Sequence, residues 1–130
     1  MATIKCFEEV EAWKLARSFY NLLGKLLYEG KFKANFGLKD QIDRASGSVM
    51  DNIAEGFERG SKAEFLVFLG YAKGSAGEVR SQLYRALDRK YISQKEFDEL
   101  HVHIIHISSC IQRFIEYLIS SKMGGIRKKK

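Results

Sequence analysis

The sequence predicts an all-α protein, an antiparallel up-and-down four-helix bundle. Four long segments repeat apolar residues at spacings of three and four, and short connectors rich in glycine or polar residues separate them. The 130 residues include no proline, so the strongest helix breaker is absent. This length fits one domain over residues 1–130, with a short disordered basic tail expected from about residue 124.

The first helix is expected over residues 8–28, after a short, poorly ordered lead. Its apolar residues form two adjacent stripes, one through Leu15 and Phe19 and one through Ala16 and Leu23. A face this wide exceeds the seam of a simple two-helix contact. Trp13 lies where this face begins and is interpreted as a core residue, with a partner surface as the alternative.

The second helix is expected over residues 38–55, after a polar connector at residues 29–36. Its inward line is Leu38, Ile42, Ala45, Val49 and Ile53. Arg44 follows Asp40 by four residues, the favourable spacing for an ion pair on one helix. The pair is interpreted as a surface pair, and a subunit contact is the alternative.

A tight corner is expected after the second helix, bracketed by Gly56 and Gly60. Glycine tolerates the left-handed conformation that ends a helix. Residues 61–64 fit a capping box, in which Ser61 and Glu64 satisfy free amides at the next helix start.

The corner also carries more polar chemistry than a turn needs. We expect Asn52 and Glu55 to turn the same way, and Arg59 to fold back on Glu55 as part of a polar network. A solvated loop and a partner or ligand site are the alternatives.

The third helix is expected over residues 62–88. Its core stripe is Phe65, Phe68, Leu69, Ala72, Ala76, Val79, Leu83 and Leu87. Gly70, Gly74 and Gly77 form another line, and together they cost roughly 3 kcal/mol relative to alanine. Close approach of a helix, from this chain or another subunit, would offset that cost. A phosphate-binding glycine loop is disfavoured because no strand precedes the helix.

The fourth helix begins at a second capping box, Ser93 to Glu96. Its seam is close to a heptad repeat through Phe97, Leu100, Ile104, Ile107, Ile111, Phe114 and Leu118. Ile105, Ile115 and Ile119 mark a second apolar face, which predicts a second neighbour in the bundle or in another subunit.

Catalytic and metal chemistry are not indicated. Of the histidines, only His103 with His106, and His106 with Cys110, have the spacing of ligands on one helical turn. No serine has a His–Asp pair placed near it, so we expect no enzyme, no metal and no cofactor. Cys6 and Cys110 are far apart in sequence and are interpreted as reduced thiols in a cytoplasmic protein.

The formal net charge of +6 is concentrated at the C-terminus, where Arg127, Lys128, Lys129 and Lys130 supply four units. The remaining chain, with 18 basic and 16 acidic residues, is nearly neutral. The candidate phosphate contacts are the tail together with Arg59, Lys62, Lys73 and Arg80. No transmembrane segment or signal peptide is expected, because no 18-residue apolar run occurs and residues 1–20 carry several charges.

One set of residues resembles the four-helix-bundle family of 23S rRNA intervening-sequence proteins, sometimes labelled ribosomal-like. The matching positions extend from about Phe7 to about Leu118. Flanking matches include Phe7–Val10, Trp13 and Gln41; the motif itself is Arg44–Ser46, Ser48, Asn52–Gly56, Arg59, Glu64–Phe65, Phe68–Leu69 and Ala72–Glu78. Met50 stands where the family usually has a nearby proline, which leaves a helix kink in question.

The resemblance implies an interaction protein of bacteria rather than an enzyme. Members of the family look like helical bundles that assemble into rings, often pentamers, and relatives serve diversity-generating retroelements with nucleic acid and a reverse transcriptase. Arg44, Asn52, Glu55, Gly56 and Arg59 are the motif residues at the expected corner. Two hypotheses therefore stand: a nucleic-acid-binding accessory protein, or a structural oligomer or adaptor with no nucleic-acid role.

Overall fold

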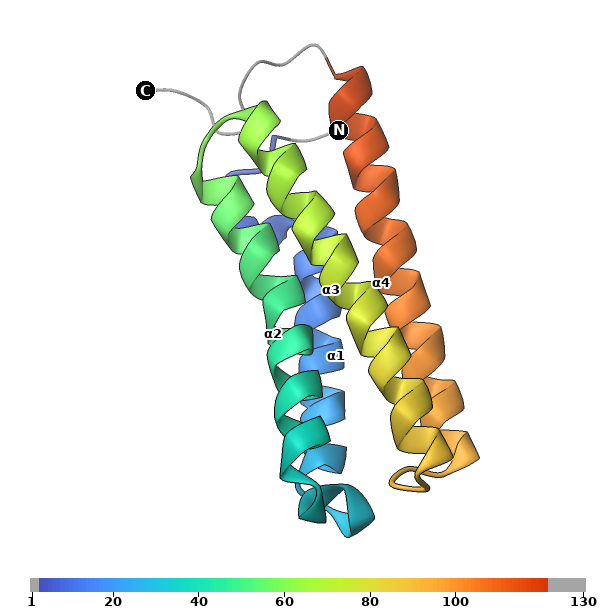
Figure 1. Cartoon of the computed structure of the whole chain (residues 1–130). Coiled ribbons are helices and arrows are strands. Elements are labelled where there is room, and N and C mark those ends of the chain that lie inside the picture. The colour runs from blue at the N-terminus through green and yellow to red at the C-terminus, as the bar shows by residue number, and fades with distance from the viewer. Residues whose placement is uncertain (1–2, 122–130) are drawn as a thin grey trace.

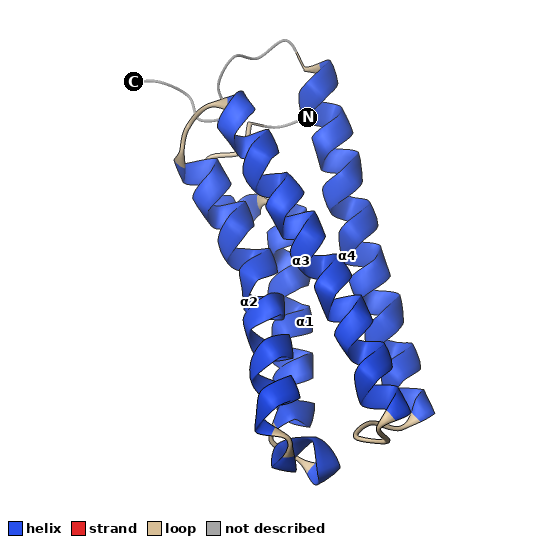
Figure 2. Ribbon diagram, in the orientation of Figure 1, coloured by secondary structure: helices blue, strands red, loops and turns tan. Residues whose placement is uncertain are grey.

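The structure, a computed structural model, describes residues 3–121 and is a four-helix bundle. Its helices are α1 (Glu11–Leu27), α2 (Phe36–Glu58), α3 (Lys62–Asp88) and α4 (Gln94–Ser120), with 3₁₀ turns η1 (Phe7–Glu9) and η2 (Gly30–Ala34). The helices run alternately in opposite directions (Figure 1), and Figure 2 shows no strand in the described part of the chain. The all-α prediction is confirmed.

The helices pack in the cyclic order α1, α2, α3, α4 and back to α1, so α2 and α4 are diagonal neighbours. The tight α2–α3 turn lies at one end of the bundle, and the α1–α2 and α3–α4 connections lie at the other (Figure 1). The end with the α2–α3 turn is termed the corner end (residues 52–66). The end with the α1–α2 and α3–α4 connections is termed the connector end (residues 28–41 and 85–93).

The predicted core stripes are buried. All five residues of the α2 line are buried, as is the α4 seam except for the half-buried Phe114. On α3 the stripe is also buried, with Phe68 and Leu87 half-buried at its edges. Apolar burial on all four helices is the main stabilising contribution expected for a bundle of this kind.

The first helix begins later than predicted. Residues 7–9 form η1 and Val10 is extended, so α1 starts at Glu11. The segment before α1 packs rather than standing free: Val10 is 2% exposed, and the Phe7 ring lies edge-on to Trp13 with 5.2 Å between centroids. Trp13 is half-buried against the core, as expected for a residue at the edge of the apolar face.

The α1–α2 connector holds a core residue that its polar composition conceals. Phe32 is 1% exposed, and its ring lies 6.0 Å from that of Tyr91 in the α3–α4 turn. Asn35 caps α2 by accepting a 2.9 Å hydrogen bond from the Leu38 amide, and its own amide donates to the Tyr91 hydroxyl at 2.7 Å. These contacts join the two connections of the connector end.

The turn between α3 and α4 combines two capping motifs, one that ends α3 and one that begins α4. Lys90 ends α3 with φ +62°, and the Tyr91 amide donates back to the Ala86 carbonyl, in the pattern of a Schellman motif. The second capping box is confirmed, because Ser93 and Glu96 exchange both reciprocal hydrogen bonds at 3.1 and 2.8 Å.

Candidate functional site: the groove between the second and third helices

Gly56 at the corner end is a packing residue rather than a helix terminator. It lies within α2, which continues to Glu58, and it is buried. A Cβ atom there would lie 2.6 Å from Cβ of Phe68 and 3.0 Å from Cδ1 of Phe65. The prediction that Gly56 ends the helix is therefore wrong: the missing side chain lets α3 approach α2. Gly60 has φ +86° and does make the turn, as predicted.

Arg59 folds back on Glu55 as predicted, with 2.9 Å between Nη2 and Oε2. Its other nitrogen lies 3.6 Å from Glu64, and its guanidinium lies 5.0 Å from the Phe68 ring centre. The hydrogen bond with Glu55 raises the pKa of Arg59. Both side chains of the Arg59–Glu55 pair are about half exposed, so the network is a surface feature.

Asn52 takes no part in that network. Its amide donates to the carbonyl and the hydroxyl of Ser48, both at 2.9 Å. The first capping box is only half formed: the Ser61 hydroxyl caps the Glu64 amide at 3.2 Å, while the Glu64 carboxylate accepts from that hydroxyl and faces Arg59. A competing cation thus displaces the carboxylate from the position that the sequence predicts.

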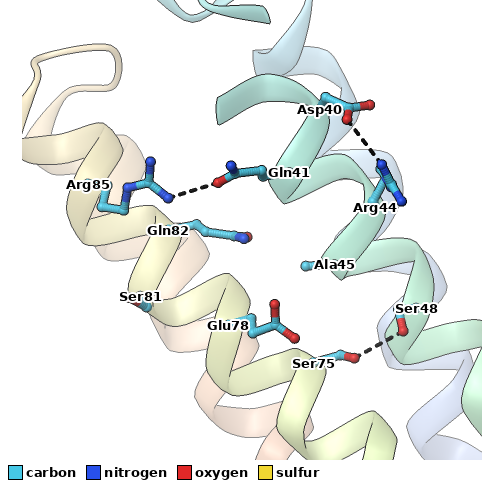
Figure 3. A pocket seen from close by; sticks show the side chains of 10 residues that line it. All are labelled: Asp40, Gln41, Arg44, Ala45, Ser48, Ser75, Glu78, Ser81, Gln82 and Arg85. Atoms are coloured by element: carbon cyan, nitrogen blue, oxygen red, sulfur yellow. Dashed lines mark hydrogen bonds and ion pairs between the residues drawn. The ribbon is translucent and has the colours of Figure 1, made fainter. Parts of the chain in front are cut away.

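Part of the resemblance motif lines a groove between α2 and α3 (Figure 3), whereas the motif residues of the corner, Asn52 to Arg59, are not among the lining residues. The groove has a volume of about 710 Å³, and its lining includes Arg44, Ser48, Ser75 and Glu78. Arg44 was predicted at the corner, but it lies several turns back along α2, and this placement is corrected. The sequence contained the signal in the spacing of these residues, but only the pairing of α2 with α3 brings them together.

Polar contacts hold the two sides of the groove. The Ser75 hydroxyl donates to the Ser48 hydroxyl at 3.0 Å, and Arg85 donates to the Gln41 amide oxygen at 2.8 Å (Figure 3). Arg44 lies 3.5 Å from Asp40 on the same helix, and both side chains are exposed. That surface pair is found as predicted, and its contribution to stability is small.

Gln82 is the least satisfied polar residue of the groove. Its side chain is aimed from α3 toward α2 (Figure 3), and it is only 8% exposed. Its Oε1 has no hydrogen-bond partner within residues 3–121. A buried acceptor left without a partner costs about 1–3 kcal/mol, so the position calls for a nearby donor.

The groove offers many hydrogen-bonding groups. Its lining combines arginines, carboxylates, serines and glutamines, and no histidine or cysteine is among the lining residues. The Ser48 and Ser75 hydroxyls bond to each other rather than to a base. Such a surface can bind a polar partner.

The four candidate phosphate contacts of the helices do not form one patch. Arg59 is paired at the corner, and the Lys62 ammonium donates to the Ser121 carbonyl at 2.7 Å. Lys73 donates to Gln112 of α4 at 2.6 Å, and Arg80 is exposed on α3. The tail residues Arg127, Lys128, Lys129 and Lys130 lie outside the described residues.

The glycine line of α3 faces away from the helices of this chain. Gly70, Gly74 and Gly77 are exposed, and a Cβ atom at any of them would meet nothing within 4 Å. Close approach by a helix of this chain, one of the two explanations, is therefore wrong; contact with another subunit stays a prediction. On α4, Ile105 and Ile119 are 39% and 64% exposed, whereas Ile115 packs partly against the core.

The histidines and cysteines have local roles in the described region. Residues 3–121 hold no group of three or more His, Cys, Asp or Glu side chains placed to bind a metal ion. His101 stacks on Phe97, with ring centres 5.0 Å apart. Cys6 and Cys110 are free thiols, and burial raises the pKa of Cys110. In the same region, none of the helices combines the length and apolar character needed to span a membrane.

Comparisons with known proteins identify a matching family and a solved structure with a similar fold. Residues 8–113 match the family described as 23S rRNA-intervening sequence protein. A crystal structure of a protein of unknown function from the S23 ribosomal protein family of Bacteroides thetaiotaomicron superposes with a TM-score of 0.73 at 21% identity. The match covers 81% of this chain and 98% of that one, and at this identity it supports the fold alone. A search of curated proteins finds no match.

Proposed function

Because the chain belongs to the family of 23S rRNA-intervening sequence proteins, we propose that it is a non-enzymatic accessory protein that assembles with itself and binds RNA electrostatically. The observation that carries the proposal is the groove, where the motif residues Arg44, Ser48, Ser75 and Glu78 present hydrogen-bonding groups to a polar partner. The net charge of +6 favours a polyanionic partner.

The basic tail supplies the first contact with phosphates in this proposal. A chain segment carrying four cations after Gly124 and Gly125 neutralises a few phosphates and releases their counterions. With about four contacts, the affinity falls by roughly three to four powers of ten for each tenfold rise in salt. Such binding has little sequence selectivity, because phosphates carry no sequence information.

The test is a titration of single- and double-stranded RNA and DNA against the full chain and a version ending at Gly125. The proposal expects salt-dependent binding that weakens when the tail is removed. Equal affinity of the two forms would show that the tail does not contribute to binding. Absence of binding by either form at low salt would contradict the nucleic-acid role and favour a protein–protein adaptor.

Self-assembly is proposed from the outer faces of α3 and α4. Val67 and Tyr71 are 51% and 57% exposed beside the glycine line, and Ile119 of α4 is 64% exposed. Exposed glycines on a helix let a second backbone approach closely, which would offset their cost in helix stability. The ring of five subunits is what the family resemblance implies. Light scattering that returned a monomer mass at micromolar concentration would reject assembly.

An adaptor role remains the second candidate, and the exposed apolar residues of α3 and α4 favour it. In that role the partner is a protein, such as the reverse transcriptase that the resemblance implies. The free cysteines suit the reducing cytoplasm as the place of action. Co-purification of a protein partner with salt-insensitive affinity, together with no RNA binding, would favour this alternative.

A further inference from the structure

Two aromatic rings stand exposed at the connector end. Tyr28, at the end of α1, is 62% exposed, and Phe36, the first residue of α2, is 73% exposed. The Lys39 ammonium lies 4.8 Å from the centre of each ring. A lysine between two aromatic faces stabilises the helix start by cation–π attraction. That attraction does not bury the rings, which remain open to a planar ligand.

The connector end is also the more basic end of the described bundle. Residues 28–41 contain three basic and two acidic residues, and residues 85–93 contain three basic and one acidic. At the corner end, residues 52–66 contain two basic and three acidic residues. The next acids along the chain, Glu96, Asp98 and Glu99, belong to the first turns of α4, which lies diagonally across the bundle from α2. The fold therefore concentrates positive charge at the connector end, although the chain without its tail is nearly neutral overall.

A polar pocket of about 370 Å³ lies at the same end of the bundle, between the start of α2 and the end of α3, and Asn35 and Gly37, the chain neighbours of Phe36, are among its lining residues. The start of α2 supplies Gly37 and Gln41 to its lining, and the end of α3 supplies Arg85, Asp88 and Arg89. Arg85 and Gln41 line both this pocket and the α2–α3 groove, so the two depressions meet at the hydrogen bond between them. Two guanidinium groups against one carboxylate favour an anionic ligand.

Lys90, next to this pocket in the chain, occupies a backbone conformation that favours glycine. Lys90 has φ +62°, a left-handed conformation that side chains other than glycine rarely adopt. Glycine is the usual residue at this position of a helix terminus. Residues held in this conformation occur preferentially at functional sites, and the lysine here adds one positive charge beside Arg89.

We propose that the connector end is a binding site for single-stranded nucleic acid. Bases stack on Tyr28 and Phe36, while Lys39, Arg85, Arg89 and Lys90 hold the phosphates. A duplex hides its base faces in the stack, so the rings discriminate in favour of a single strand. The inference rests on the proposed function and deepens it, because it locates the site and names the form of nucleic acid.

The rings are tested with the double variant Tyr28→Ala/Phe36→Ala of the full chain. The probes are a single-stranded oligouridylate of about 12 nucleotides and an RNA duplex of the same length. The variant should lose roughly tenfold or more in affinity for the single strand, with little change for the duplex and with the salt dependence unchanged. Its melting temperature should stay near that of the parent, because both rings are exposed.

The cations are tested with the double variant Arg89→Gln/Lys90→Gly. Its matched control is Lys5→Gln/Lys14→Gln, which removes the same charge from exposed positions near the other end of the bundle. Loss of two phosphate contacts should reduce the slope of log affinity against log salt by about 1.4 for a single strand. The control should leave that slope close to the parent value.

Three outcomes would overturn the inference, and they are distinguishable. If the parent protein binds RNA and both variants bind it equally well, the site is wrong while the proposed function stands. If the parent binds no nucleic acid at low salt, the site and the function fail together. If the ring variant changes the mass measured by light scattering, the rings belong to a subunit contact.

Discussion

The corner end and the connector end of this bundle differ in how they use polar residues. The corner end looks richer in chemistry, yet its arginine is paired, its Gly56 is buried against two phenylalanines, and Phe57 and Phe65 pack edge to face with centres 5.9 Å apart. The connector end looks like an ordinary polar loop, yet it carries exposed rings and an open pocket. A cluster of polar motif residues can therefore serve packing, and a connector without a recognisable motif can carry the surface that is accessible to a ligand.

The largest expected effect comes from Gly56→Ala at the corner end. The new methyl group would lie within 3.0 Å of the two phenylalanine side chains, and one of these contacts is with the rigid Cβ of Phe68. Such overpacking should lower the free energy of unfolding by about 1–3 kcal/mol. Urea denaturation measures it, and an unchanged midpoint would show that the corner is looser than this account holds.

Gly74→Ala is the matched substitution on the open face of α3. Nothing lies within 4 Å of its Cβ position, so alanine should raise the free energy of unfolding by about 1 kcal/mol. The same urea experiment measures it, with light scattering alongside. If the variant loses mass or stability instead, a helix from another subunit packs on this glycine.

Lys90→Gly tests the backbone strain at the connector end. Glycine removes the steric penalty at φ +62°, which should outweigh its greater chain entropy and raise stability by about 0.5–1 kcal/mol. Thermal unfolding measures the gain. A loss of stability would mean that the lysine side chain makes contacts that offset its backbone conformation.

Glu55→Ala should have the smallest effect. The Glu55–Arg59 pair is about half exposed, and exposed pairs four residues apart on a helix contribute little. The melting temperature should be unchanged within error, with Asp40→Ala, from the more exposed pair with Arg44, as a reference. A clear fall for Glu55→Ala alone would show that Arg59 needs its partner to hold the corner.

Local patterns were sufficient to predict most of the fold. Helix periodicity gave the core stripes, and α3 has the predicted bounds because Ser61 caps its start and the positive φ of Lys90 ends it. Phe32 was missed because a single apolar residue in a polar connector has no periodicity. Gly56 was misassigned because a glycine near a helix end has two explanations, and only the position of Phe68 decides between them.

The candidate site was harder to predict than the fold for the same reason. Arg44, Ser48, Ser75 and Glu78 are visible in the sequence as motif residues, but their shared groove depends on the register between α2 and α3. The pocket of the connector end likewise combines residues about fifty positions apart, such as Asn35 and Arg89. Spacing along one helix cannot predict such pairings.

The most direct test of the difference between the two ends is a nuclear magnetic resonance titration of the full chain with single-stranded oligouridylate. Backbone amide shifts report which residues meet the ligand, without any substitution. Within the described bundle, the largest changes are predicted at residues 28–41 and 85–91, with smaller changes at residues 52–66, which lie beside the start of the tail. Changes confined to residues 52–66, with the connector end unaffected, would contradict it.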